Sequence, residues 1–145
     1  MEPKIDNLNE RESAWINAQL ERARDFVAAN EPAKAGRQFT VKELDYAFTA
    51  WIRNGATEDS QAINGVINCV GIAFGQFLVD ETGLRWVVAT DEYGSDLAVY
   101  GLPGAGDVLV YPANFIAKRW EKREVDFIER SVQRIAQQVR SIRKG

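Results

Sequence analysis

The sequence predicts a single α+β domain, residues 1–145, in which helices precede and follow a small antiparallel sheet along the chain. Apolar residues recur at helical spacing until about residue 81, and from residue 84 the apolar pattern has a period of two. Clusters of Asp, Gly and Pro then separate three short apolar runs, as turns separate strands. A chain of 145 residues with 46% hydrophobic content is long enough to bury one core. We therefore expect three N-terminal helices, a three-stranded antiparallel meander, a short helix and a long C-terminal helix.

The first two helices are marked by residue types that cap helix N-termini. Asn7 with Glu10 predicts the start of the first helix. Thr40 with Glu43 has the spacing of a capping box, in which each side chain accepts a hydrogen bond from the other residue's backbone N–H, and predicts the start of the second helix. Gly55 should end this helix, because glycine readily adopts the left-handed conformation of a helix C-terminus.

The third helix is predicted from about Asp59 to Glu81, with Gly83 behind it. It carries two different stripes at helical spacing. One stripe is broad and apolar, which is typical of a helix at the centre of a domain. Its members are Ile63, Val66, Ile67, Val70, Phe74, Phe77 and Leu78.

The second stripe consists of Asn64, Asn68, Gly71 and Gly75, at spacings of four, three and four. A glycine inside a helix costs about 1 kcal/mol relative to alanine, so two of them predict that another element packs closely there. The alternative is a ligand groove lined by the two amide side chains. Cys69, between the stripes, is expected to be a buried small hydrophobic residue.

Residues 60–79 contain no charged side chain, so a membrane span has to be weighed against a buried helix. Four amide side chains interrupt the segment: Gln61, Asn64, Asn68 and Gln76. Acidic residues flank both ends, without the Lys/Arg asymmetry that orients a span. The pattern favours the central helix of a soluble protein, and we expect no membrane partner.

The three predicted strands are Leu84–Thr90, Asp96–Tyr100 and Asp107–Tyr111. Their apolar, aromatic and β-branched content is typical of half-buried strands. The segments Asp91–Gly94 and Pro103–Gly106 are rich in turn-forming residues and should connect the strands as tight turns. Together they predict the antiparallel meander.

Two helices should follow the meander. Pro112 suits the first position of a short helix. The last helix is predicted over about residues 124–143, where apolar residues alternate at spacings of three and four. These residues are Val125, Ile128, Val132, Ile135, Val139 and Ile142. This narrow seam would either dock along the domain or form a homodimer interface.

Composition excludes several classes of site. The chain has no histidine and one cysteine, so a Ser-His-Asp triad, a Cys-His pair and a zinc site with histidine ligands are impossible. One cysteine forms no intramolecular disulfide, and the first residues lack a signal-peptide pattern, so we expect a cytoplasmic protein. The net charge of −3 makes nucleic acid an unexpected partner, although residues 113–145 carry nine basic and four acidic side chains. We assign no cofactor and no metal.

The most concentrated polar feature is the hairpin that carries Asp91, Glu92, Tyr93 and Asp96, with Asp107 in the next turn. Asp and Gly are common in tight turns for backbone reasons alone. An aromatic side chain among acids is also typical of a protein-docking surface. A third alternative is that the carboxylates hold a divalent cation, although their spacing is not that of a calcium loop.

From residue 71 onward the chain resembles an uncharacterised bacterial domain-of-unknown-function family. The resemblance spans about residues 60–125 and rests on short segments of sequence. These are Gly71-Ile72-Ala73-Phe74-Gly75-x-x-Leu78, Trp86-Val87-Val88, Asp91-Glu92-Tyr93-Gly94-x-Asp96-Leu97-Ala98, and Pro112 before a helix with Lys118 and Arg119. It implies a small bacterial α+β protein with no assigned activity, no cofactor and no catalytic residue.

Three hypotheses of function remain. The first is a non-catalytic binding or regulatory module that recognises another protein through the acidic hairpin. The second is an enzyme that uses the hairpin carboxylates and Asp107 with a divalent cation; the missing histidine disfavours it. The third is an oligomeric scaffold built on the C-terminal seam. We assign no catalytic residue and favour the first hypothesis.

Overall fold

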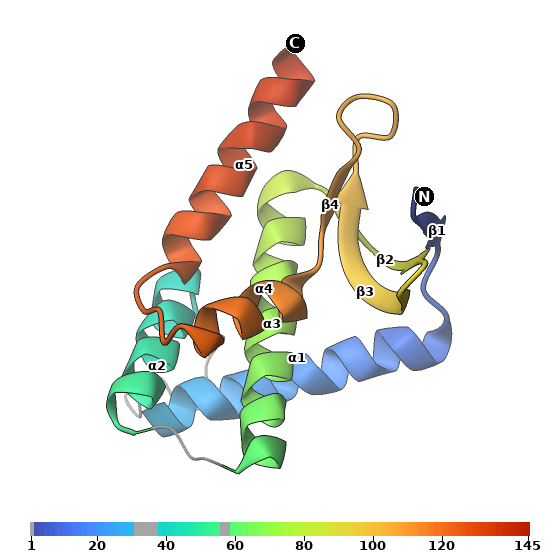
Figure 1. Cartoon of the computed structure of the whole chain (residues 1–145). Helices are drawn as coiled ribbons and strands as arrows, with labels where there is room; N and C mark the ends of the chain where they lie inside the picture. Colours follow the sequence, from blue (N-terminus) through green and yellow to red (C-terminus); the bar gives the residue numbers. More distant parts are fainter. Residues whose placement is uncertain (1, 31–37, 56–58) are drawn as a thin grey trace.

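The computed structural model describes residues 2–30, 38–55 and 59–145, which form five helices and four strands (Figure 1). The α+β class is confirmed: three of the described helices lie between the first strand and the other three strands along the chain, and two helices follow the last strand. The elements are β1 (Lys4–Asp6), α1 (Glu10–Asn30), α2 (Val41–Arg53), α3 (Ser60–Thr82), β2 (Arg85–Asp91), β3 (Gly94–Gly101), β4 (Val108–Val110), α4 (Pro112–Glu121) and α5 (Ile128–Lys144).

The cap of the first helix lies two residues later than predicted. Asn9, not Asn7, caps α1: the Glu12 backbone N–H donates to the Asn9 side chain, and the Asn9 backbone N–H donates to Glu12, both at 2.8 Å. The prediction for α2 is confirmed, since Thr40 and Glu43 form the reciprocal capping box. Both helix starts are thus determined by local side-chain chemistry.

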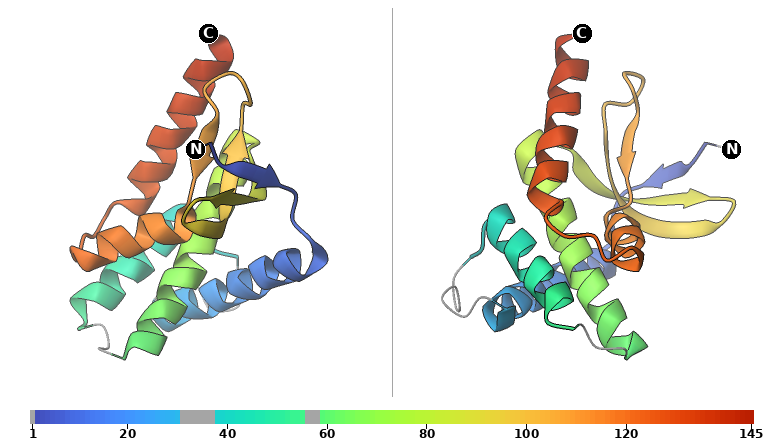
Figure 2. Two further views of the ribbon diagram at one scale, coloured as in Figure 1. Left: turned by 45° about the vertical axis from the view of Figure 1, so that its right-hand side comes forward. Right: turned by 60° about the vertical axis from the view of Figure 1, so that its left-hand side comes forward.

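Helix α3 is the centre of the molecule and packs against α1, α4 and α5 (Figure 2). Asp59 caps its N-terminus, and Gly83 ends it in the left-handed conformation with φ of 74°. Its middle is almost completely buried, including Val70, Phe74 and Leu78. Of the described helices, it is the one whose length and composition would allow it to cross a membrane, but half of its most apolar window is buried inside the protein.

The sheet has four antiparallel strands in the order β1-β2-β3-β4, so the three-stranded prediction lacked one strand. The additional strand is β1, in which Ile5 pairs with Ala89 on the edge of β2. The predicted meander β2-β3-β4 is present. Side chains alternate between the two faces of the sheet. Trp86 and its partner Val99 join the main core, whereas Val87 and its partner Ala98 belong to a second, smaller apolar cluster.

The last helix begins at Ile128, four residues later than predicted, and Val125 lies in the segment before it. Asp126 in that segment has a positive φ of 59°, which a helix does not allow. Contacts with α2 hold this conformation: the Asp126 N–H donates to Thr49 Oγ1 at 3.2 Å, and Arg53 forms an ion pair with its carboxylate at 3.4 Å.

A residue of α2 also caps α5. The Glu129 N–H donates to Asp45 Oδ2 at 3.1 Å, which takes the place of a cap from the preceding segment. Burial raises the pKa of Asp45 above its ordinary value of 3.8, although the backbone hydrogen bonds to α5 act in the opposite direction. The α2–α5 junction therefore depends on tertiary contacts and not on local signals.

The predicted apolar seam of α5 faces the rest of the same chain. Ile128, Val132, Ile135 and Val139 are buried, and α5 packs against α2 and α3. Ile142 and Val125 are half-buried. In a single chain the seam thus docks along the domain, and the homodimer remains a prediction.

Candidate functional site

The acidic hairpin is built by a two-residue turn between β2 and β3. Asp91, the last residue of β2, pairs with Gly94, the first residue of β3, so that Glu92 and Tyr93 form the turn. Asp91 stabilises the turn by accepting a hydrogen bond from the Tyr93 N–H at 2.8 Å. Gly94 has a φ of 127°, a conformation that residues other than glycine rarely adopt. The turn leaves Tyr93 90% exposed at the tip.

The strand register brings the two aspartates to one face of the sheet. Asp96 pairs with Ala89, and Asp91 follows Ala89 by two residues on the same strand. Tyr111 packs against the cluster that contains Ala89, on this same face. Together with the start of α4 they surround an open hollow of about 290 Å³. The hollow is lined by Asp91, Tyr93, Gly94, Ser95, Asp96, Tyr111 and Asn114.

The hollow is electrostatically negative. Burial raises the pKa of Tyr111 above its usual value of 10, and the nearby charges of Asp91 and Asp96 raise it further. Neither aspartate has an ion pair within residues 2–30, 38–55 and 59–145. Asp91 accepts the hydrogen bond from the Tyr93 N–H in the turn, and Asp96 accepts one from the Leu97 N–H at 2.8 Å. Two carboxylates thus lie close to a protonated phenol, and no described Lys or Arg forms an ion pair with either of them.

Three of the four hairpin residues singled out from the sequence, Asp91, Tyr93 and Asp96, line this hollow. Glu92 is exposed in the turn and is not part of the lining. Sequence reasoning missed Tyr111 and Asn114, which lie beyond β4. These two residues reach the hollow because β4 pairs with β3, which brings the start of α4 next to the hairpin. The sequence around Tyr111 and Asn114 does not by itself reveal this pairing.

Asp107, a residue of the metal hypothesis, has a different role from the hairpin carboxylates. It accepts hydrogen bonds from the Gly104 N–H at 2.9 Å and from the Tyr100 hydroxyl at 3.3 Å, and so stabilises the turn before β4. In the part of the chain that the structure describes, no three His, Cys, Asp or Glu side chains are arranged to hold a metal ion. Among the described residues, the carboxylates thus form no group of three potential metal ligands.

The glycines of the Asn64/Asn68 stripe are covered by neighbouring elements. A Cβ on Gly71 would lie 2.6 Å from Ala113 Cα, and one on Gly75 would overlap the Trp86 ring and lie 2.8 Å from Pro112 Cγ. Asn64 is exposed and Asn68 half-buried. The side of α3 that carries the glycines is thus filled by α4 and Trp86, as the close-packing alternative expects, and leaves no groove at Gly71 and Gly75.

Fold and site together define a small α+β protein with an acidic, aromatic-lined hollow at a hairpin. Residues 48–129 match the model of the Domain of unknown function (DUF3806) family, more than half of the chain, and the protein belongs to this family. The segment that carried the resemblance, about residues 60–125, lies inside the matched region. No curated protein and no solved structure matches the chain.

Proposed function

We propose that this protein is a non-catalytic binding module that holds a lysine or arginine side chain of a partner protein in the hairpin hollow. The observation that carries the proposal is the placement of Asp91 and Asp96, without ion pairs among the described residues, beside Tyr93 and Tyr111 around one hollow. The proposal includes a soluble partner in the cytoplasm, where the sequence leads us to expect the protein.

The lining fits a cationic side chain in three ways. Two carboxylates attract a guanidinium or ammonium group and accept its hydrogen bonds. Tyrosine rings attract a cation placed over their faces. The side-chain amide of Asn114, in the first turn of α4, offers a further hydrogen-bond acceptor. Tyr93, 90% exposed at the tip, supplies apolar contact area of the kind that anchors protein interfaces.

The same chemistry favours binding over catalysis. The pKa of Tyr111 is raised above its usual value of 10, so its hydroxyl is protonated at neutral pH and is free to donate a hydrogen bond to a ligand. The chain has no histidine to exchange protons at that pH. The hollow therefore offers negative charge that complements a cation, and no histidine to shuttle protons near neutral pH.

The proposal is tested with a double variant, Asp91→Asn with Asp96→Asn, which keeps the shape of both side chains and removes both charges. The matched control is Asp25→Asn with Glu121→Gln, which removes the same net charge from exposed positions on α1 and α4. Affinity capture with wild type and both variants, washed at low and raised salt, identifies a partner. Titration of the purified partner then gives the affinities.

We expect the partner to bind wild type and the control alike, and the hairpin variant about tenfold or more weakly. Raised salt should weaken the wild-type complex, because exposed charges are screened. Substituting a single Lys or Arg of the partner should reproduce the loss. Equal affinity of a folded hairpin variant and wild type would refute the proposal.

A further inference from the structure

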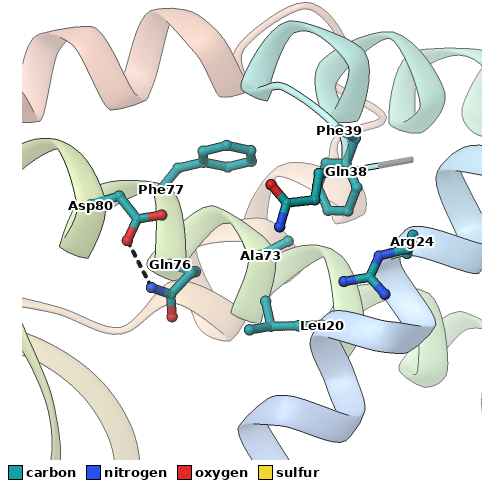
Figure 3. A pocket seen from close by; sticks show the side chains of 8 residues that line it. All are labelled: Leu20, Arg24, Gln38, Phe39, Ala73, Gln76, Phe77 and Asp80. Atoms are coloured by element: carbon teal, nitrogen blue, oxygen red, sulfur yellow. Dashed lines mark hydrogen bonds between the residues drawn. The ribbon is translucent and has the colours of Figure 1, made fainter. Parts of the chain in front are cut away.

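A second cavity, separate from the hairpin hollow, lies where α1 and residues 38–39 meet α3 (Figure 3). Its volume is about 210 Å³, and none of the described residues that line it also lines the hollow. Helix α3 contributes four residues at helical spacing, α1 contributes two residues one turn apart, and the segment before Thr40 contributes two. The lining residues are Leu20, Arg24, Gln38, Phe39, Ala73, Gln76, Phe77 and Asp80.

The inner part of the cavity is apolar. The rings of Phe39 and Phe77 meet edge to face, with their centroids 5.9 Å apart. Leu20 and Ala73 complete the apolar surface, and Ala73 is buried. An aliphatic chain placed here would leave water and gain hydrophobic stabilisation.

The rim of the cavity carries two opposite charges on different sides. Arg24 from α1 and Asp80 from α3 lie on opposite sides of the cavity in Figure 3, and the Arg24 guanidinium extends toward it. Both residues are exposed, and neither has an ion pair with another described residue. The amide of Gln38 also points into the space between them in Figure 3.

One of the two charges is held in place by a hydrogen-bonded relay from the sheet. The indole N–H of Trp86 donates to Gln76 Oε1 at 3.0 Å, which fixes the orientation of the Gln76 amide. Gln76 Nε2 then donates to Asp80 Oδ1 at 2.9 Å. The second oxygen of Asp80 has no hydrogen bond to any described residue and remains available as an acceptor.

Arg24 and Asp80 place a positive and a negative charge on opposite sides of a small apolar cavity. A ligand with a negative group at one end and a positive group at the other would complement both charges. We propose that this cavity binds a small amphipathic zwitterion, a short aliphatic chain with an ammonium group at Asp80 and a carboxylate at Arg24. Arginine pairs well with a carboxylate because its planar group donates two parallel hydrogen bonds. The cavity is smaller than the range of about 300–1,000 Å³ for drug-sized ligands, so the ligand is correspondingly small.

The test uses ω-amino acids of increasing chain length, from glycine to 8-aminooctanoate, titrated into the full chain by calorimetry. Alkylamines and alkyl carboxylates of the same lengths carry only one of the two charges. Arg24→Gln and Asp80→Asn each remove one protein charge, and Arg22→Gln and Glu81→Gln remove the same charges from exposed neighbours on α1 and α3. Circular dichroism shows that each variant is folded.

We expect binding to peak at one chain length, since only one length spans the two charges. Arg24→Gln and Asp80→Asn should each weaken the best ligand about tenfold, and the neighbouring control variants should leave its affinity unchanged. NMR signals of the Gln38 and Gln76 side-chain amides should shift on binding. The Asp91→Asn, Asp96→Asn variant should bind the zwitterion normally, which separates this site from the hairpin hollow.

Three results would overturn the proposal. The first is the absence of binding by every ω-amino acid in the series. The second is an amine or carboxylate that binds as tightly as the zwitterion of the same length. The third is an affinity that Arg24→Gln and Asp80→Asn leave unchanged.

Discussion

Two sides of α3 meet their surroundings in opposite ways. Gly71 and Gly75 lie one turn apart on one side, where Ala113, Pro112 and the Trp86 ring approach so closely that no Cβ fits. Nearly opposite on the helix, the residues Ala73, Gln76, Phe77 and Asp80 line an open cavity. The glycine side is therefore closed, and the side with larger residues is open.

In α3 the stripe of small residues marks close packing and not a groove. A missing side chain leaves room that a neighbouring backbone or ring fills, because protein interiors are packed at nearly crystal density. A cavity remains instead where helices diverge and larger side chains support its walls. In α3, Phe77 and its partner Phe39 form such a wall.

The largest expected effect comes from adding a methyl group to the closed side. Gly75→Ala places a Cβ against both the Trp86 ring and Pro112, and Gly71→Ala places one against the Ala113 backbone. We expect each to lower the free energy of unfolding by about 3 kcal/mol, as overpacked cores do. Urea denaturation measures the change.

The matched control is Gly65→Ala in the same helix, since nothing lies within 4 Å of a Cβ at Gly65. Because alanine favours helices over glycine, this variant should gain about 0.5–1 kcal/mol. A gain in stability for Gly75→Ala would contradict the close contact between the Trp86 ring and Gly75.

The next effect concerns Cys69, which is 4% exposed beside the same packed core. Burial raises the pKa of its thiol from 9.0 to about 11. Between these pH values the unfolded chain releases the thiol proton before the folded chain does, so stability falls as the pH rises. We expect wild type to lose about 2 kcal/mol relative to Cys69→Ala between pH 9 and pH 11, in urea denaturation at each pH.

The same burial should protect the Cys69 thiol from reaction with reagents in solution. At pH 8 the native protein should react with a disulfide reagent only as fast as local or global unfolding exposes Cys69. In urea, where the chain is unfolded, Cys69 should react at the rate of an ordinary exposed cysteine. Rapid labelling of the native protein, or parallel stability curves for wild type and Cys69→Ala, would contradict the buried thiol.

A smaller effect is expected at the contact that joins the two sides. Trp86→Phe removes the indole N–H that donates to Gln76, at a cost of about 1 kcal/mol. It also removes the ring atoms nearest to Gly75. In the double variant with Gly75→Ala, the total loss of stability should therefore be smaller than the sum of the two single losses. Additive losses would show that the ring and the glycine do not meet.

The sequence predicts the locally encoded parts of this fold well. The Thr40–Glu43 capping box, Gly83 at the end of α3 and Pro112 at the start of α4 all act as expected. Each works through contacts within a few residues of itself, so a short stretch of sequence contains the whole signal. The same holds for Asp91 and Gly94 in the hairpin turn.

The features that escaped prediction depend on distant partners. Strand β1 has one apolar residue, Ile5, and is a strand because it pairs with the free edge of β2. The late start of α5 follows from contacts of Asp126 and Glu129 with α2. The hairpin hollow needs Tyr111, and the second cavity needs Arg24, each from a different part of the chain. No local pattern carries such information.

The smallest expected effect is on the open side, at Asp80. Its carboxylate is exposed and accepts one hydrogen bond from Gln76, which the amide oxygen of asparagine can also accept. Asp80→Asn should therefore change the free energy of unfolding by less than about 0.5 kcal/mol, as exposed substitutions usually do. Urea denaturation beside Glu81→Gln checks this. A loss as large as that of Gly75→Ala would mean that Asp80 supports the fold, and the contrast between a closed structural side and an open binding side of α3 would fail.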